Sequence, residues 1–440
     1  MRHAISWADL RGARVGVWGL GVEGDANLRM LATLDAEVVR VDDVKTSHDG
    51  RDVLAPDRGG LDALLRCDVV VKSPGISRRR PAIDMLERAG VPVLGGVGLW
   101  LQSAPLDRVV AVTGTKGKST TSAMLGHLLE RLGHPAMVCG NIGRPPYDPE
   151  LAKVRPRYWV IEMSSYQATD VAVSPRLVAV TSLHPDHLDW HGSVEQYYAD
   201  KLSLCAQPGA VRTIASGASP ALVERAALLG PEVEWVQSDP ARRASWHRSF
   251  GARGDHNLDN AEIAGRCLAA LGFEADDRAL ADAAADFPGL DHRLQTVGSI
   301  DGVEFVDDSL STNVLATLRA IDTFASERTA VIVGGHDRGI DYRALGHGLA
   351  NRDTPLLVVT IPASGERIRR ELAATALAAS VQVVAAEDLT HAVEVAFTWA
   401  RPKGVVLLSP AAPSFGVYRD YRERADAFAH AIRALAVGGS

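Results

Sequence analysis

The sequence predicts an α/β protein of three domains, each built on a mostly parallel β-sheet. Short runs rich in Val, Ile and Leu alternate with Ala- and Leu-rich stretches along most of the chain, and this order favours parallel strands joined by helices. The runs are apolar throughout, as expected where helices cover both faces of a sheet. A length of 440 residues suits about three domains of ordinary size.

The first series of strands ends before a break at Ser103-Ala104-Pro105. We expect strands over 15–18, 37–41 and 68–71, and a helix over 26–34 that follows a glycine turn. This series predicts a first domain over residues 1–106.

Two more series follow, separated by a break at Phe287-Pro288-Gly289. Domains are therefore expected over 107–289 and 290–440. The strands expected in the second series are 108–112, 158–161 and 177–180, and those of the third are 302–306, 330–333, 356–359 and 405–408.

Charge and composition exclude several classes of partner. Lys and Arg number 47 against 54 Asp and Glu, so the net charge of −7 gives no basic field for nucleic acid or an anionic membrane. A phosphate ligand must therefore be bound by a local device. No run reaches the ~20 apolar residues of a membrane span, and the N-terminus lacks the apolar core of a signal peptide. The four cysteines lie far apart without a CxxC pair, which indicates reduced thiols in a cytoplasmic protein.

The most informative segment is Val112-Thr113-Gly114-Thr115-Lys116-Gly117-Lys118-Ser119-Thr120, between an expected strand and a helix expected over 123–132. Such a loop turns backbone N–H groups toward a polyphosphate, and the helix dipole adds to the attraction. Lys118 can reach the β- and γ-phosphates, and the Ser119 hydroxyl can bind Mg²⁺. Val112 stands where the general P-loop has glycine, so we interpret the segment as a shortened nucleotide loop.

Other polar segments of this series leave alternatives open. Glu162 ends a strand where a second Mg²⁺ ligand is needed, although acidic residues there also serve as helix N-terminal charges. The His184 to Asp189 segment has poor spacing for zinc. Lys201 by itself suits a helix surface, and the Gly254 to Asn260 segment by itself suits a helix cap.

The first domain contains Gly19-Leu20-Gly21-Val22-Glu23-Gly24 directly after its first strand. This pattern is typical of a diphosphate-binding turn, and Asp42 and Asp43 after the next strand could contact a ribose or a base. A nicotinamide dehydrogenase is the usual interpretation. Because the chain has another nucleotide loop at residue 114, a nucleotide-sugar site is a simpler interpretation than a dehydrogenase.

The loop from Gly114 to Ser119, followed by Gly140-Asn141-Ile142-Gly143, resembles the ATP-binding domain of the Mur ligases. These ATP-dependent amide-bond ligases build the peptidoglycan stem peptide and are related to folylpolyglutamate synthases. The resemblance covers essentially the whole chain. It implies a Rossmann-like N-terminal domain for the UDP-sugar, a central P-loop-type ATPase domain and a Rossmann-like C-terminal domain for an amino acid.

The resemblance also implies individual roles. ATP contacts are implied for Gly114, Thr115, Lys116, Gly117, Lys118, Ser119, Thr120, Asn257, Asn260, Arg293 and Asp308. Two Mg²⁺ ions would be organised by Ser119, Glu162, His187 and a carbamylated Lys201, and the catalytic residues would be Lys118, His187 and Lys201. The UDP substrate would contact Gly19, Leu20, Gly21, Asp42, Asp43, Ser73, Pro74, Gly75 and Asn141. Glutamate would contact Thr312, Arg338, Ser414 and Tyr421.

The segments from Asp307 to Asn313 and from Gly334 to Asp341 resemble the glutamate-adding branch of the family, with a departure in each. Leu310 and Arg338 stand where D-glutamate-adding members usually have lysines. Losing an ammonium near a carboxylate removes a contact of about 1.5–3 kcal/mol, and arginine does not replace lysine conservatively. A rebuilt acceptor pocket favours the branch that adds L-glutamate to UDP-N-acetylmuramoyl-L-alanine and leaves inversion to a separate epimerase. Addition of D-glutamate stays open.

The resemblance predicts a cytoplasmic, monomeric enzyme that passes through an acyl phosphate. A folate polyglutamylase is disfavoured by the Rossmann-like N-terminal domain. A non-catalytic ATP-binding module is the alternative outside the enzymes.

Overall fold

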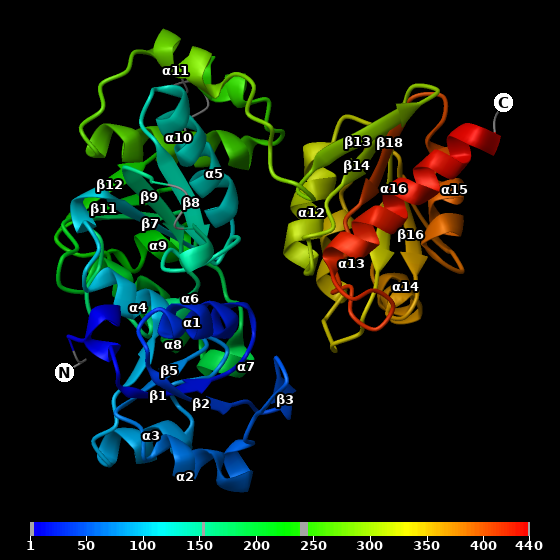
Figure 1. Ribbon diagram of the computed structural model, residues 1–440. Helices are drawn as coiled ribbons and strands as arrows, with labels where there is room; N and C mark the ends of the chain where they lie inside the picture. Colours follow the sequence, from blue (N-terminus) through cyan, green and yellow to red (C-terminus); the bar gives the residue numbers. More distant parts are fainter. Residues whose placement is uncertain (1–3, 152–154, 238–244, 439–440) are drawn as a thin grey trace. The chain divides into compact units, whose positions relative to one another are not determined.

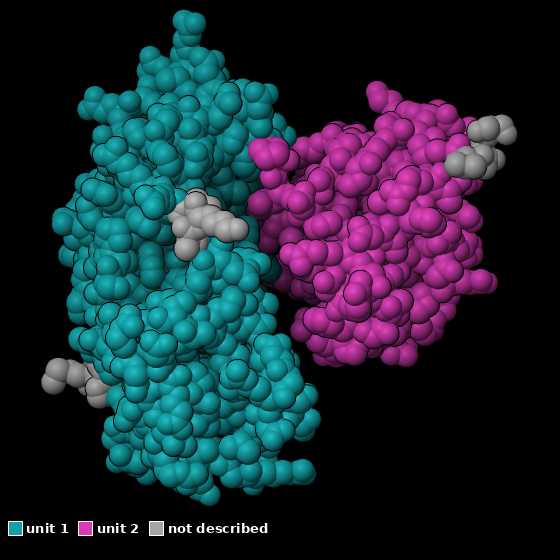
Figure 2. All heavy atoms as spheres, in the orientation of Figure 1, with its two compact units in different colours: residues 1–252, 256–287 teal, residues 253–255, 288–440 magenta. Residues whose placement is uncertain are grey.

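The computed structural model describes residues 4–151, 155–237 and 245–438. The chain forms two compact units, unit 1 with residues 1–252 and 256–287 and unit 2 with residues 253–255 and 288–440 (Figure 2). Three sheets with mainly parallel strands confirm the predicted fold class (Figure 1). Residues on both sides of position 106 lie in unit 1, so the domain limits stay a prediction.

The first sheet of unit 1 has the strand order β2-β1-β5-β6, and all its neighbours are parallel. Its strands are β1 (Arg14–Trp18), β2 (Glu37–Val41), β5 (Val69–Lys72) and β6 (Val93–Gly95). The helices are α1 (Val22–Ala32), α2 (Leu61–Leu64), α3 (Pro81–Arg88) and α4 (Gly96–Leu101), and β3 (Ser47–His48) pairs with β4 (Arg51–Asp52). The helix expected over 26–34 begins at Val22, because extended Gly21 caps it and acidic residues in its first turn suit the dipole.

The second sheet of unit 1 is fully parallel, in the order β12-β11-β10-β7-β9-β8. Its strands are β7 (Val109–Thr113), β8 (Ala136–Gly140), β9 (Tyr158–Glu162), β10 (Leu177–Val180), β11 (Arg212–Ser216) and β12 (Glu232–Val236). The helices are α5 (Lys118–Arg131), α6 (Ser165–Ala168), α7 (Leu188–His191), α8 (Val194–Leu202), α9 (Pro220–Val223), α10 (Asp255–Ala270) and α11 (Asp277–Ala284). The helix expected from residue 123 begins at Lys118, because left-handed Gly117 turns the chain directly into it.

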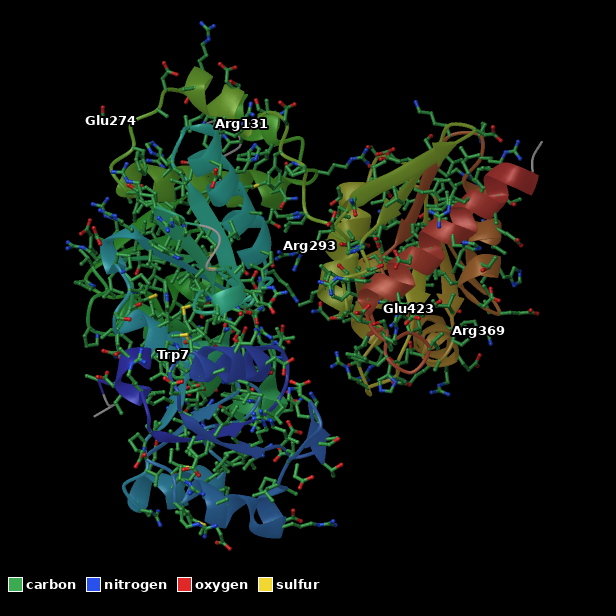
Figure 3. All side chains as sticks on the ribbon, in the orientation of Figure 1. Trp7, Arg131, Glu274, Arg293, Arg369 and Glu423 are labelled. Carbon is green, nitrogen blue, oxygen red and sulfur yellow. The ribbon has the colours of Figure 1, made fainter. Side chains whose placement is uncertain are left out.

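One hydrophobic core joins the two sheets of unit 1, and it includes residues from β1, β5, β7 and β9. The indole of Trp7 donates a hydrogen bond to the Gly96 carbonyl at 3.1 Å and lies 4.9 Å from the ring of Tyr147 (Figure 3). Tyr147 in turn donates to Asn27 of α1 at 2.7 Å. Residues before and after position 106 therefore pack as one body.

Ion pairs reinforce this joint. The Lys72 ammonium, fully buried at the end of β5, lies 2.5 Å from a carboxylate oxygen of Asp170. Arg78 contacts the second oxygen of Asp170 at 2.7 Å. Two further pairs, Arg29–Asp148 at 2.6 Å and Arg79–Asp200 at 2.8 Å, also join the two parts of unit 1.

The sheet of unit 2 has the order β13-β14-β18-β15-β16-β17, with only the edge strand β13 antiparallel to its neighbour. The strands are β13 (Gln295–Ile300), β14 (Val303–Asp307), β15 (Thr329–Gly334), β16 (Leu356–Ile361), β17 (Val381–Ala385) and β18 (Gly404–Leu408). Helices α12 (Val314–Thr323), α13 (Arg343–Leu349) and α14 (Gly365–Ala373) pack on one face, and α15 (Leu389–Ala400) and α16 (Tyr421–Gly438) on the other. Within the described ranges no helix is long and apolar enough to cross a membrane.

We predict that Asp170→Ala lowers the free energy of unfolding by about 3–5 kcal/mol, because it leaves the buried Lys72 without its carboxylate. Denaturant unfolding followed by circular dichroism measures the change. Glu224→Ala, which removes an exposed partner of Arg225, is the control and should change stability by less than about 0.5 kcal/mol. An equal effect of both variants would contradict the structural role of the Lys72–Asp170 pair.

Candidate active site

Polar residues gather at the carboxyl ends of three neighbouring strands in unit 1, β10, β7 and β9. The nucleotide loop follows β7, Glu162 is the last residue of β9, and the segment that carries His187 follows β10. Neighbouring parallel strands end at one edge, where ligands bind in such sheets. The structure therefore brings the predicted ATP and metal residues of unit 1 together.

The loop between β7 and α5 can only be made with glycine at two positions. Gly114 and Gly117 have φ angles of 137° and 89°. A Cβ at Gly114 would lie 2.2 Å from the Thr181 hydroxyl, and one at Gly117 would lie 2.5 Å from an Asn260 oxygen. Ser182 accepts hydrogen bonds from the amides of Thr115 and Lys116. Helix α5 begins directly after this loop, and helix N-termini of this kind bind phosphate.

Two predicted lysines converge inside this loop. Lys118 donates to the carbonyls of Gly114 at 3.0 Å and Thr115 at 3.2 Å, and Lys201 of α8 donates to the same Gly114 carbonyl at 3.0 Å. Lys201 is buried, and desolvation together with the charge of Lys118 lowers the pKa of its amine well below the ordinary value. This shift favours the neutral amine form of Lys201 over its ammonium form.

Glu162 has an unsatisfied oxygen at this edge. Its side chain is buried, and one oxygen accepts a hydrogen bond from the Asn141 amide at 2.8 Å. The other oxygen is buried without a hydrogen-bond partner among the described residues. An orphaned carboxylate oxygen beside a phosphate loop fits a cation ligand.

The remaining metal candidates do not form a ready-made cluster. Within the part of the chain that the structure describes, no group of three or more His, Cys, Asp and Glu side chains could hold a metal ion. Ser119 is buried in the first turn of α5. His187, at a left-handed φ of 51°, packs edge-on against Tyr166, and desolvation lowers the pKa of its imidazole. A cation here needs oxygens from phosphate or from a modified side chain as well.

Sequence reasoning missed several residues that support Lys201. Tyr197 shares a hydrogen bond of 2.9 Å with the Thr115 hydroxyl. Ser165, His191 and Asp200 form a buried chain with contacts of 2.9 Å and 2.7 Å, and Arg79 pairs with Asp200. The proximity of His191 and Asp200 to Lys201 in the sequence is a weak signal, and only the fold gives it meaning.

Two further residues with predicted ATP contacts, Asn257 and Asn260, lie behind the same loop. Asn260 of α10 accepts a hydrogen bond from the Thr121 hydroxyl at 3.2 Å and donates to Asn257 at 2.9 Å. Because Asn260 also lies against Gly117, the structure places α10 next to the start of α5.

Most of the predicted UDP residues gather in the same way at the carboxyl ends of β2, β1 and β5. Asn141 is the exception, because it follows β8 in the second sheet and donates to Glu162. Ser73 donates to the Gly19 carbonyl at 2.6 Å, and the Leu20 amide donates to Asp42 at 2.7 Å. Asp43 pairs with Arg80 at 2.6 Å. Gly21 caps α1, and Pro74 and Gly75 continue the loop from Ser73.

This loop contacts the ATP-side half of unit 1. The indole of Trp190 in α7 donates to the Gly75 carbonyl at 3.1 Å. The Trp190 ring also stacks on Tyr166, which contacts His187. One short path therefore connects the predicted UDP loop with the predicted metal histidine.

In unit 2 the predicted residues follow the neighbouring strands β14, β18 and β15. Asp308 follows β14 and accepts a hydrogen bond from Ser409 at 2.7 Å, and burial raises the pKa of Asp308 to about 6. Thr312 lies further along the same loop, Ser414 follows β18, and Arg338 follows β15.

Two other predicted residues of unit 2 flank these loops in sequence. Tyr421 begins α16 and packs edge-on against His292, with ring centroids 5.5 Å apart. Arg293 is exposed on unit 2 (Figure 3). Its predicted contact with an ATP held by unit 1 stays a prediction.

Comparison with known proteins agrees with this arrangement. The Mur ligase middle domain matches residues 112–224, and the Mur ligase, glutamate ligase domain matches residues 292–412. A UDP-N-acetylmuramoyl-L-alanine–L-glutamate ligase of Xanthomonas euvesicatoria pv. vesicatoria is 40% identical and covers 96% of this chain and 95% of its own length. A ligase of the same name from Salinispora tropica is 39% identical, over 97% of this chain and 98% of its own length.

A solved structure shows the same fold. The MurF ligase of Thermotoga maritima in complex with ADP has a TM-score of 0.57 at 16% identity and covers 98% of each chain. The nucleotide loop, the strand-end clusters and the near full-length matches lead to one conclusion. This chain belongs to the Mur ligase family of ATP-dependent amide-bond ligases.

Proposed function

We propose that this chain joins L-glutamate to UDP-N-acetylmuramoyl-L-alanine with hydrolysis of ATP, a step of peptidoglycan precursor synthesis in the cytoplasm. Two buried groups beside the nucleotide loop carry the proposal of phosphoryl transfer: the amine of Lys201, which contacts the Gly114 carbonyl and has a lowered pKa, and the unpaired oxygen of Glu162. The names of the two relatives support the choice of substrates.

The proposed reaction has two steps. The alanine carboxylate of the UDP substrate attacks the γ-phosphorus of ATP, giving ADP and an acyl phosphate. The glutamate amine then attacks the acyl carbon, loses a proton and expels inorganic phosphate as the amide bond forms. Most of the rate enhancement in such transfers comes from positioning and charge stabilisation, and Lys118 supplies positive charge at the loop.

Two Mg²⁺ ions fit the polar groups of unit 1, and when bound they would offset the charge of the phosphates. Ser119 and Glu162 would hold one ion. His187 and a carbamate on Lys201 would hold the other.

The carbamate follows from the chemistry of Lys201. In its neutral form, which the lowered pKa favours, the amine can attack CO₂, forming an N–C bond and releasing a proton, which yields an anion. Within the described residues Lys201 contacts a carbonyl and the ring of Tyr197, and its electrostatic neighbours include Lys118 and Lys116. An anion at this position would turn repulsion from both lysines into attraction, and bound Mg²⁺ would offset its repulsion from Asp186 and Glu162.

The acceptor residues favour L-glutamate over D-glutamate. Leu310 is half-buried and supplies no charge, and Arg338 is exposed on the loop after β15. D-glutamate-adding members usually place two ammonium groups at these positions, whereas this chain places one guanidinium there. The proposal implies a separate epimerase that acts on the product. It requires groups from one chain only, so we propose that the enzyme acts as a monomer.

We predict that phosphate release in the presence of ATP, Mg²⁺ and UDP-N-acetylmuramoyl-L-alanine is faster with L-glutamate than with D-glutamate by about tenfold or more, equivalent to the loss of one charge-assisted contact. The measurement compares kcat/KM for the two isomers, with mass spectrometry of the product. Preference for D-glutamate would reject the choice of isomer. No release with either isomer would reject the proposed function.

We predict that Lys201→Ala lowers kcat by about 100-fold or more, because the proposed anionic ligand is lost. Formate or acetate at high concentration should restore part of the activity by replacing the carbamate. Lys403→Ala, at an exposed lysine, is the control. A Lys201→Ala enzyme with near-normal kcat would show that the carbamate is not used.

We predict that Glu162→Gln raises the Mg²⁺ concentration for half-maximal activity by about tenfold, since the amide keeps the acceptor for Asn141 but loses the charge at the unpaired oxygen. Titration of phosphate release with Mg²⁺ measures the shift. Glu195→Gln, at an exposed glutamate of α8, should leave the titration unchanged. Identical Mg²⁺ curves for Glu162→Gln and wild type would argue against a metal at Glu162.

A further inference from the structure

The four predicted glutamate residues come from four separate segments of unit 2. Thr312 lies on the loop after β14, Arg338 on the loop after β15 and Ser414 on the loop after β18, whereas Tyr421 begins α16. The three loops lie outside the sheet, so strand pairing does not fix their positions relative to one another. A binding pocket needs loops whose relative positions are fixed precisely, so contacts other than strand pairing must hold them.

Arg424 makes such contacts. It lies in the first turn of α16, next to Glu423, which Figure 3 labels, and its side chain is fully buried. One guanidinium nitrogen, Nη1, donates to the Ala412 carbonyl at 3.0 Å, and the other, Nη2, donates to the Ser309 carbonyl at 2.8 Å. The planar fork of one arginine therefore joins α16 to the loops after β14 and β18.

The loop after β15 meets the same group. A Cβ added at Gly335 would lie 3.1 Å from Nη1 of Arg424 and 2.4 Å from the Pro413 carbonyl. Gly335 has a φ of 147°, a conformation that side chains rarely adopt. The backbone of the third loop thus passes directly against the guanidinium, where only glycine fits.

Ser309 is held from its other side as well. Asp307, at the end of β14, accepts hydrogen bonds from the amide and the hydroxyl of Ser309 at 2.9 Å and 2.6 Å. The second oxygen of Asp307 contacts His292 at 2.7 Å, and His292 packs against Tyr421. The contacts therefore form a closed circuit from α16 through the loop after β14 and His292 back to α16.

Stability alone does not explain why Arg424 carries a charge in the protein interior. Burial lowers the pKa of Arg424 to about 10, and its Nε atom has no hydrogen-bond partner among the described residues. At neutral pH the guanidinium still carries its charge inside the protein. Apolar side chains of similar volume often stabilise a fold as well as a buried ion does, so a role beyond stability is indicated.

We propose that Arg424 is a positioning residue that fixes the shape of the acceptor pocket, by holding the loops after β14, β15 and β18 against the start of α16. The inference rests on the proposed function, since it takes glutamate to be the ligand of these loops. Lysine cannot substitute, because a single ammonium cannot span both carbonyls with the geometry of the fork.

The test compares Arg424→Lys and Arg424→Met with wild type by steady-state kinetics for each substrate. The KM for L-glutamate should rise about tenfold in Arg424→Lys and more in Arg424→Met, while the KM for UDP-N-acetylmuramoyl-L-alanine stays within about twofold. The ratio of kcat/KM for L-glutamate over L-aspartate should also fall. Millimolar guanidinium should lower the glutamate KM of Arg424→Ala by filling the vacated site.

Arg352→Met is the matched control. Arg352 also donates to two main-chain carbonyls of unit 2, those of Phe324 and Thr354, but these lie before the amino ends of β15 and β16. Its loss should reduce thermal stability without changing the glutamate KM. Wild-type activity that does not depend on glutamate would reject the proposed function, whereas a glutamate-dependent wild type with an unchanged KM in Arg424→Lys would overturn the inference alone.

Discussion

The placement of the candidate sites depends on one constraint, that neighbouring parallel strands end at the same edge of their sheet. The edge of β2, β1 and β5 gathers the predicted UDP loops, and that of β10, β7 and β9 gathers the predicted ATP and metal residues. The edge of β14, β18 and β15 gathers the loops that carry Thr312, Ser414 and Arg338. Residues far apart in the sequence meet because each follows a strand, and the same device forms each cluster.

The sequence predicted the strands inside the sheets except the buried strand β11, and it missed most of the edge strands. The apolar runs at β7, β10, β15 and β18 are fully buried and were predicted within a residue or two. The exposed edge strand β13 contains Gln295, Thr296 and Ser299, and a run of this kind has no apolar signal. The edge strand β12 alternates Glu with apolar residues, and pairing with β11, rather than composition, makes it a strand.

The residues of the candidate site also differ in whether their contacts are local or distant in the sequence, and only the local ones could be predicted from spacing. Gly114, Gly117 and Lys118 lie within one short loop, so their joint role is readable from spacing. The contact of Lys201 with the Gly114 carbonyl joins residues that are distant in sequence, and a motif resemblance rather than a physical pattern pointed to it. Arg424 carried no local signal at all, because an arginine in the first turn of a helix is ordinarily exposed to solvent.

Three buried lysine and arginine side chains among the described residues differ in what compensates their charge, and that difference indicates what each one does. Lys72 lies 2.5 Å from the carboxylate of Asp170, so its charge is satisfied within the fold and its role is structural. Lys201 donates to a carbonyl, and burial together with the charge of Lys118 lowers the pKa of its amine, which favours the reactive neutral form. Arg424 keeps its charge and donates hydrogen bonds to the carbonyls of two loops. A buried basic group without a carboxylate in hydrogen-bonding contact is costly to retain, and both such groups donate to carbonyls of loops that follow strands, where ligands are expected.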